Sequence, residues 1–237
     1  EGLSVRSISI NGAQVAESDF TYAGGKLTLE TVPHHFEFGA VVDIEPESNT
    51  SLEGLYRSRT MYCTQCEAEG YRKITFGLDR PDVLSTFTVS LSADKTVCPV
   101  LLSNGNEVAR SDLEDGRHKV VWHDPHPKPS YLFALVAGDL QLVADRFVTQ
   151  SGKPVDLRIW VEAKDTGYCD HAMASLKASM RWDEERYGLE YDLDLFNIVA
   201  VDDFNMGAME NKSLNIFNTS CVLAHPDITT DLGYQRV

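Results

Sequence analysis

Residues 201–211 contain the groups of this sequence that are best suited to chemistry. Apolar runs precede and follow this stretch, which predicts a strand on each side of it. Gly207 and Ala208 lie between the two runs, and their small side chains let another chain approach the backbone closely. An extended peptide could pair with such a backbone as an added strand. Glu210 follows, and its carboxylate could bind a free amino terminus through charge-assisted hydrogen bonds.

The string at 207–211, Gly-Ala-Met-Glu-Asn, resembles the exopeptidase motif of the aminopeptidase N family, the gluzincin zinc aminopeptidases. Its flanks, 205–206 and 212–218, are similar to the proteobacterial alanyl aminopeptidases. The resemblance covers residues 50–235, and before residue 50 it rests on strand pattern alone. Further stretches that carry it are 54–56, 63–72, 78–83, 101–106, 129–138 and 182–188. The alternative for the motif is an ordinary strand–loop–strand with an exposed Glu.

The resemblance implies a site for the amino terminus of a peptide. A Gln-x-Glu pair of the family's first domain, here Gln65 and Glu67, would reach the cleft beside Glu210. Both carboxylates would hold the α-ammonium group, which is largely protonated at neutral pH because its pKa is about 7.7–8.0. Two carboxylates in one pocket repel each other unless a cation lies between them, so the pair favours ammonium groups. Without the resemblance, Glu67 would be interpreted as a surface carboxylate.

Further roles follow from the same resemblance. The backbones of Gly207 and Ala208 would align the scissile peptide bond, and Met206 would line the pocket for the first side chain. A flexible thioether accommodates varied apolar side chains, although Met is also common in cores. Asn211 would hold the loop in shape through its side-chain amide. The predicted substrate-binding residues are Gln65, Glu67, Met206, Gly207, Ala208, Met209, Glu210 and Asn211.

The zinc ligands of this family are absent from the sequence. They are two His of an H-E-x-x-H helix and a downstream Glu, but none of the seven His here is followed by Glu or by a His at i+4. The resemblance places the start of the zinc helix a few residues past Val237. We therefore expect no metal and no catalytic residue in this chain, and zinc in the full-length enzyme. Close pairs that stay open as metal or redox sites are His34-His35, His123-x-x-His126 and Cys63-x-x-Cys66.

Composition restricts the class of protein further. The 237 residues include 36 acidic and 21 basic side chains, hence 36 − 21 = 15 net negative charges, which argues against a nucleic-acid binder. No apolar run approaches the ~18 residues of a membrane helix. Five scattered cysteines are typical of reduced thiols in a cytoplasmic protein. The first residues resemble neither a signal peptide nor a natural beginning, so we expect that an N-terminal piece was removed. We expect a monomer.

The hydrophobic pattern predicts a mainly β protein in two domains. Short alternating runs separated by turn residues indicate a β-sandwich or saddle-like domain over residues 1–139. Residues 140–237 are expected to form the β-rich start of a thermolysin-like α/β catalytic domain, with strands and one helix. Asp165 or Thr166 is expected to cap that helix, and Gly188 to end it. The expected strands are 3–10, 27–29, 37–44, 74–76, 86–91, 119–122, 131–137, 141–149, 156–162 and 195–201.

Three hypotheses for function follow. The first is a zinc-dependent aminopeptidase that releases N-terminal amino acids from peptides, of which this chain carries the amino-terminus recognition site but not the zinc site. The second is a non-catalytic β module that binds peptide ends. The third is a bifunctional epoxide hydrolase of the same superfamily, whose motif usually departs from Met-Glu-Asn. An H-E-x-x-H motif soon after Val237 would favour the first over the second.

Overall fold

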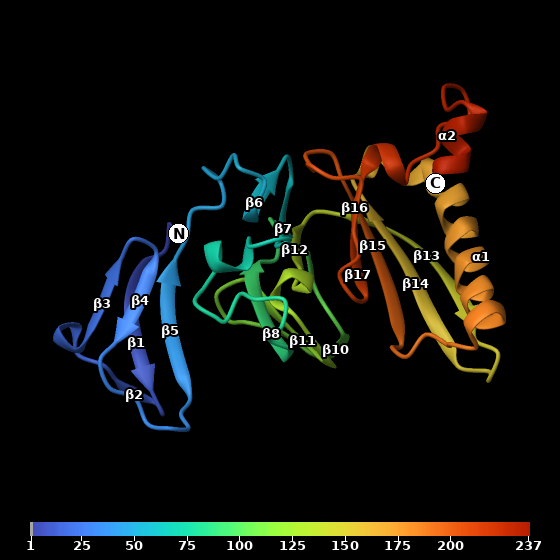
Figure 1. The fold of residues 1–237 in the computed structure, drawn as a ribbon. Helices are drawn as coiled ribbons and strands as arrows, with labels where there is room; N and C mark the ends of the chain where they lie inside the picture. Colours follow the sequence, from blue (N-terminus) through green and yellow to red (C-terminus); the bar gives the residue numbers. More distant parts are fainter. Residues whose placement is uncertain (1) are drawn as a thin grey trace.

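The computed structural model describes residues 2–237 as a row of β-sheets that ends in a sheet covered by a long helix (Figure 1). At one end lie a three-stranded sheet of order β2-β1-β5 and a separate hairpin, β3-β4. The two-residue turn at Asn11 and Gly12 joins β1 to β2, and both residues have the positive φ that such a turn needs. The bounds are β1 (Ser4–Ile10), β2 (Ala13–Gln14), η1 (Glu17–Asp19), β3 (Phe20–Ala23), β4 (Lys26–Leu29) and β5 (Phe38–Asp43).

Two antiparallel sheets form the middle of the molecule, with the orders β6-β7-β12-β9 and β10-β11-β8. Exposed and half-buried residues alternate along β8, as expected for a strand with one face toward solvent. The bounds are β6 (Gly54–Ser58), β7 (Met61–Gln65), η2 (Tyr71–Lys73), β8 (Ser85–Asp94), β9 (Val100–Ser103), β10 (Asn106–Asp112), β11 (Arg117–Lys128), η3 (Ser130–Leu132) and β12 (Leu135–Gly138).

The last sheet has the order β13-β14-β15-β17-β16. Strands β14, β15 and β17 are parallel, whereas β13 and β16 run antiparallel to their neighbours. Helix α1 makes the crossover between β14 and β15 that a parallel pair requires. The bounds are β13 (Gln141–Val148), β14 (Pro154–Val161), η4 (Ala163–Tyr168), α1 (Asp170–Tyr187), β15 (Leu195–Val201), β16 (Ala208–Met209), β17 (Leu214–Asn218), η5 (Thr219–Cys221) and α2 (Asp231–Arg236).

One hydrophobic core joins the middle sheets to the last sheet. Tyr56 and Trp122 of the middle sheets belong to the same buried cluster as Val199 and Ile216 of the last sheet. A second cluster lies between α1 and the other face of the last sheet, where Met173 and Met180 of the helix are buried. The predicted mainly β fold class is therefore confirmed. The boundary near residue 139 stays a prediction, which the change of sheet between Gly138 and Gln141 supports.

Three local predictions differ from the structure. Residues 74–76 are not a strand: Ile74 ends the 3-10 turn of η2, and the Phe76 ring packs edge-on against Tyr22 of the hairpin at 5.3 Å between centroids. The apolar run 131–137 is split between η3 and β12, because Phe133 N–H donates to Ser130 O and closes a turn.

The helix cap is the third difference. Neither Asp165 nor Thr166 caps α1, because both lie within the 3-10 helix η4; Cys169 is the N-cap and makes no side-chain cap bond. Gly188 does end α1, as predicted: its φ is 66° and its N–H donates to Glu184 O at 3.0 Å. None of the helices formed by residues 2–237 has the length and apolar character needed to cross a membrane.

Candidate functional site

The Gly-Ala-Met-Glu-Asn motif lies at an edge of the last sheet. Strand β16 is the outermost strand and pairs antiparallel with β17 through Ala208–Phe217 and Met209–Ile216. Next to these pairs, the N–H of Asn218 donates to Gly207 O at 2.9 Å. Antiparallel partners alternate between hydrogen-bonded and non-bonded pairs, so the backbone N–H and C=O of Ala208 point away from β17. The exposed backbone of Ala208 is therefore open for pairing with another chain, whereas the carbonyl of Gly207 already has a partner.

The structure brings Gln65 next to the motif. Gln65 is the last residue of β7 in the middle sheet, and its buried Nε2 lies 3.6 Å from the Sδ of Met209 and 3.4 Å from Glu67 O. Glu67 follows two residues after Gln65, Glu210 follows Met209, and both Glu side chains are exposed. The peptide bond after Glu67 is cis. The segments that carry the two carboxylates therefore meet at the contact between β7 and β16.

Two amide oxygens beside this contact lack a hydrogen-bond partner among residues 2–237: Oε1 of Gln65 and Oδ1 of Asn211. Both side chains are buried, and a buried polar atom without a partner costs about 1–3 kcal/mol. Each oxygen can accept only from a donor, such as an N–H group or an ammonium group. The Nδ2 of Asn211 lies 3.5 Å from Met209 O, the long limit of a hydrogen bond, so its role in holding the loop stays a prediction.

Met206 is half-buried and packs against the core cluster that joins the middle and last sheets. This position agrees with both interpretations of the sequence, a pocket residue and a core residue. Its predicted role in lining the first side-chain pocket therefore stays a prediction.

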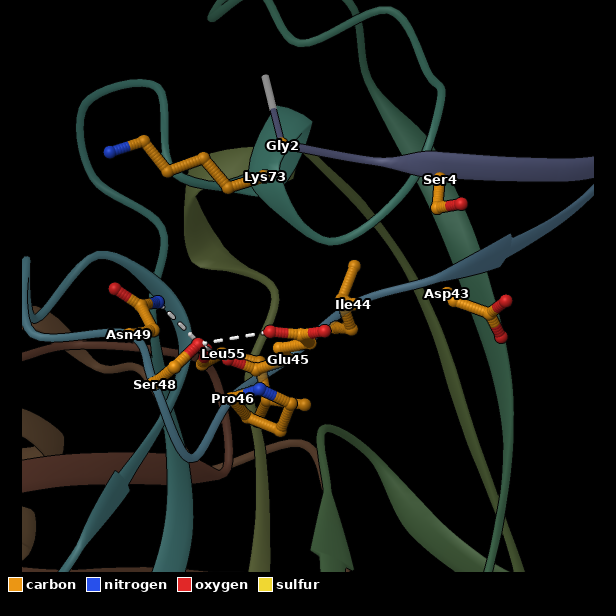
Figure 2. A pocket seen from close by; sticks show the side chains of 10 residues that line it. All are labelled: Gly2, Ser4, Asp43, Ile44, Glu45, Pro46, Ser48, Asn49, Leu55 and Lys73. Atoms are coloured by element: carbon orange, nitrogen blue, oxygen red, sulfur yellow. Dashed lines mark hydrogen bonds between the residues drawn. The ribbon is translucent and has the colours of Figure 1, made fainter.

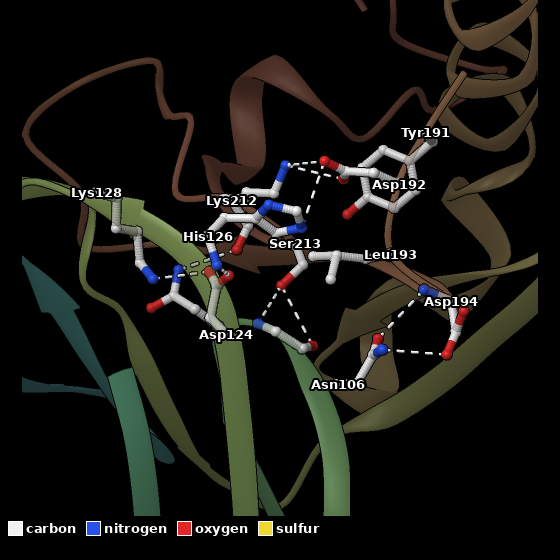
Figure 3. A network of polar contacts seen from close by, with 12 residues as sticks. Asn106, Asp124, His126, Lys128, Tyr191, Asp192, Leu193, Asp194, Lys212 and Ser213 are labelled. Carbon is white, nitrogen blue, oxygen red and sulfur yellow. Dashed lines mark hydrogen bonds and ion pairs between the residues drawn. The ribbon is translucent and has the colours of Figure 1, made fainter. Parts of the chain in front are cut away.

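The residues after the motif are fixed to the middle sheets by a polar network (Figure 3). The Nζ of Lys212 lies 2.9 and 3.0 Å from the two carboxylate oxygens of Asp192, and Nε2 of His126 lies 3.4 Å from the same group. Burial acts to raise the pKa of Asp192, but Lys212 and His126 outweigh it, so the pKa is lowered overall. The Nδ2 of Asn104 donates to Lys212 O at 3.0 Å. The C-terminal flank of the motif is thus held by the loop before β15 and by Asn104, which follows β9, while His126 of β11 contacts Asp192 of that loop.

Beside this network lies a buried ion pair. The Nζ of Lys128 is 2.7 Å from Oδ2 of Asp124, and both side chains are almost completely buried. Burial lowers the pKa of Lys128, although the Asp124 carboxylate acts to raise it. The Lys128 ammonium also lies 4.5 Å from the centre of the Phe87 ring. This pair lies at the end of β11, close in sequence to His126, which contacts Asp192.

The sequence candidates for a metal site belong to no cluster of metal-binding groups in the part of the chain that the structure describes. Residues 2–237 contain no group of three or more His, Cys, Asp or Glu that could hold a metal ion. Cys63 and Cys66 are buried free thiols, and burial raises the pKa of both, that of Cys63 to about 12. Metal binding and thiol exchange both need the thiolate, so this environment disfavours both. The zinc of the predicted enzyme does not fit the residues present here.

A cavity of about 590 Å³ lies away from the motif, between the first sheet and β6 (Figure 2). It is lined by polar groups that include Asp43, Glu45 and Lys73. Asp43 is paired with Arg6 and Lys73 with Glu53, so the charges of Asp43 and Lys73 are already neutralised by neighbours. None of the predicted site residues lines this cavity.

A mixed sheet with a crossover helix is joined through one hydrophobic core to antiparallel β-sheets, and Gln65 lies at their junction beside the motif. Comparison with known proteins identifies the family of this chain. Residues 7–132 match the Peptidase M1 N-terminal domain, and residues 171–237 match the Peptidase family M1 domain. The chain belongs to the peptidase M1 family.

The relatives are aminopeptidases by name. Aminopeptidase N of Caulobacter vibrioides is 53% identical over 100% of this chain and 27% of its own length. Aminopeptidase N of Escherichia coli is 57% identical over 89% of this chain and 24% of its own. The crystal structure of Legionella pneumophila aminopeptidase A in complex with aspartic acid superposes with a TM-score of 0.95 at 36% identity, over 100% of this chain and 28% of that one. The chain thus spans about a quarter of the length of these relatives.

The structure also identifies residues near the motif that the sequence did not suggest. Ser58 of β6 and Asp203 of the loop between β15 and β16 bond to each other, and Ser213 bonds to the backbone of Gly105. Each of these contacts joins positions more than a hundred residues apart.

Proposed function

We propose that the whole protein is a zinc-dependent aminopeptidase that releases N-terminal amino acids from peptides, and that this chain supplies its site for the peptide's amino terminus. The observation that carries the proposal is the contact between Gln65 and Met209, which brings the Gln-x-Glu pair beside the motif from a different sheet. The names of the relatives, all aminopeptidases, support the reaction class.

In this proposal the peptide binds as an additional strand along β16. The outward N–H and C=O of Ala208 pair with the peptide backbone and fix its direction. Glu67 and Glu210 are exposed at the end of that strand and bind the α-ammonium group. Oε1 of Gln65 lacks a partner and is an acceptor suited to one of the ammonium hydrogens. Only a peptide with a free amino terminus satisfies all of these groups.

The proposed zinc belongs to the whole protein and not to this chain. Because residues 2–237 hold no ligand group, we assign no metal-dependent step to them and propose that other residues of the whole protein hold the zinc. We also propose a cytoplasmic location, which the five free thiols support. A monomeric state stays a prediction.

Steady-state kinetics of the whole protein on an alanyl anilide test the proposal. Glu210→Ala removes a charged hydrogen bond to the substrate ammonium, so kcat/KM should fall roughly 10- to 150-fold. Glu210→Gln keeps the size of the side chain and should recover little of the loss, because the charge is what binds ammonium. Glu17→Ala, which removes an exposed Glu of η1 far along the chain, is the control and should leave kcat/KM unchanged. Equal kcat/KM for Glu210→Ala and Glu17→Ala would remove Glu210 from the site.

A further inference from the structure

The loop over residues 202–207, which leads from β15 into the motif, is held from two sides. On one side, Asn218 of β17 donates from its backbone to Gly207 O at 2.9 Å and from Nδ2 to Phe204 O at 3.0 Å. On the other side, β6 of the middle sheet bonds the loop at Asp203. The buried Tyr56 donates its hydroxyl to Asp203 O at 2.9 Å. The conformation of the loop therefore depends on a strand of the middle sheet as much as on its own sheet.

Ser58, also in β6, makes a reciprocal pair with Asp203. Its Oγ donates to Oδ2 of Asp203 at 2.8 Å and lies 3.2 Å from the Asp203 N–H, from which it accepts. The first bond has an ionised acceptor, and such bonds are stronger than those between neutral groups. Ser58 is buried, so water cannot replace the hydroxyl without a rearrangement of β6. The two bonds fix both the side chain and the backbone of Asp203.

The same hairpin presents the other half of the proposed site. Strand β6 is paired antiparallel with β7, with Ser58 opposite Met61 and Gly54 opposite Gln65. The far end of β7 therefore carries Gln65, and Glu67 follows it. A displacement of Asp203 from Ser58 moves the motif loop relative to the hairpin that carries Glu67. The spacing of Glu67 and Glu210 is thus coupled to the Ser58–Asp203 pair through a rigid, hydrogen-bonded element.

We propose that Ser58 and Asp203 are positioning residues that set the spacing of Glu67 and Glu210 around the substrate's amino group. The inference rests on the proposed function, since it concerns the same recognition site. Neither residue contacts the substrate; they act through the motif loop. Loss of the pair should therefore weaken binding of ligands that carry an ammonium group and leave ligands without one unaffected.

The test uses the whole protein, an alanyl anilide substrate and two competitive inhibitors of similar shape, n-butylamine and n-butanol. Ser58→Ala and Asp203→Ala should each raise the Ki of n-butylamine roughly tenfold, because one misaligned charged hydrogen bond is worth about that factor. The Ki of n-butanol should not change. Asp203→Asn keeps an acceptor oxygen for the Ser58 hydroxyl and should restore most of the affinity for n-butylamine. The double variant should be no worse than either single Ala variant, because the two residues act as one unit.

The matched control is Thr60→Ala. Thr60 lies at the turn between β6 and β7 and bonds to Glu162 at 2.9 Å, so it joins the same two parts of the molecule without contact to the motif loop. Its variant should bind both inhibitors as the unaltered protein does. Equal loss of affinity for the amine and the alcohol, or no loss in either Ala variant, would overturn the positioning role while the proposed function stands. An unaltered protein that does not distinguish the amine from the alcohol would overturn the proposed function itself.

If Ser58→Ala fails to fold, the comparison of Asp203→Ala with Asp203→Asn decides the question by itself. Asp203 is exposed, so its substitution leaves the buried core of the protein intact. A full recovery of amine affinity in Asp203→Asn supports the pair. Equal affinities of the two variants for n-butylamine would contradict it.

Discussion

Ser213, two residues after the motif, holds the C-terminal flank of the site to the middle sheets. Its backbone has φ +62°, the left-handed region that side chains other than glycine rarely adopt, and only 1% of the residue is exposed. Its Oγ accepts from the N–H of Gly105 at 2.6 Å and lies 3.4 Å from Gly105 O (Figure 3). Gly105 cannot be replaced by a residue with a side chain, because its φ is +89° and a Cβ there would lie 2.1 Å from His123 O.

The hydrogen bond of Ser213 to Gly105 stabilises the fold, whereas the left-handed backbone of Ser213 destabilises it. Two substitutions separate these effects. Ser213→Ala keeps the strained backbone and leaves the buried Gly105 N–H without a partner, so it should destabilise the fold by about 1–3 kcal/mol. Ser213→Gly loses the same bond but relieves the left-handed backbone by about 1–2 kcal/mol. Glycine also loses more conformational freedom on folding, which costs about 0.5–1 kcal/mol. The expected order of stability is therefore the unaltered protein, then Ser213→Gly, then Ser213→Ala.

Amide hydrogen exchange followed by mass spectrometry gives a local measurement of this effect. In the unaltered protein, peptides that contain Gly105 should be protected, because its N–H is buried and bonded to Ser213. Protection should fall in both variants, and thermal unfolding should rank them in the order above. Ser92→Ala, at an exposed position of β8, is a control that should change neither measurement.

Two outcomes would refute this reasoning. Unchanged protection of Gly105 in Ser213→Ala would show that the hydroxyl does not hold the N–H. A Ser213→Gly variant less stable than Ser213→Ala would show that the left-handed backbone at this position is not strained.

Two further predictions concern buried charges. Burial raises the pKa of Asp165 above its ordinary 3.8, so the stability that Asp165 contributes is fully present below pH 3.8 and is lost as pH rises through the folded-state pKa. Asp165→Asn should therefore raise the melting temperature at pH 7 but not at pH 3.5. Equal shifts of the melting temperature at both pH values would contradict burial as the cause. Asp124→Asn leaves the buried Lys128 ammonium without its counter-charge and should destabilise by about 3–5 kcal/mol in urea unfolding. The double change Asp124→Leu with Lys128→Leu should cost less than Asp124→Asn, and the reverse order would show that the ion pair is not what Asp124 supplies.

Helices and strands were predictable from the sequence where neighbouring residues alone determine them. The alternation of side chains located most strands, and Gly188 marked the end of α1 because only glycine adopts φ +66° there without strain. The start of the helix was predicted wrongly, because Asp165 is buried in a 3-10 turn that its local sequence does not distinguish from a cap. The strand predicted over residues 74–76 was wrong for a similar reason, because the aromatic ring of Phe76 packs against the distant β3-β4 hairpin.

By itself, the sequence determined the family and the motif, because the five residues 207–211 are consecutive and their types carry the resemblance. Tertiary structure alone decided what surrounds the motif. The contacts Gln65–Met209 and Ser58–Asp203 join residues 144 and 145 positions apart, and Gly105–Ser213 joins residues 108 apart. Such contacts depend on how two sheets share one hydrophobic core. That shared core is a property of packing across the whole chain, and no local pattern of side chains encodes it.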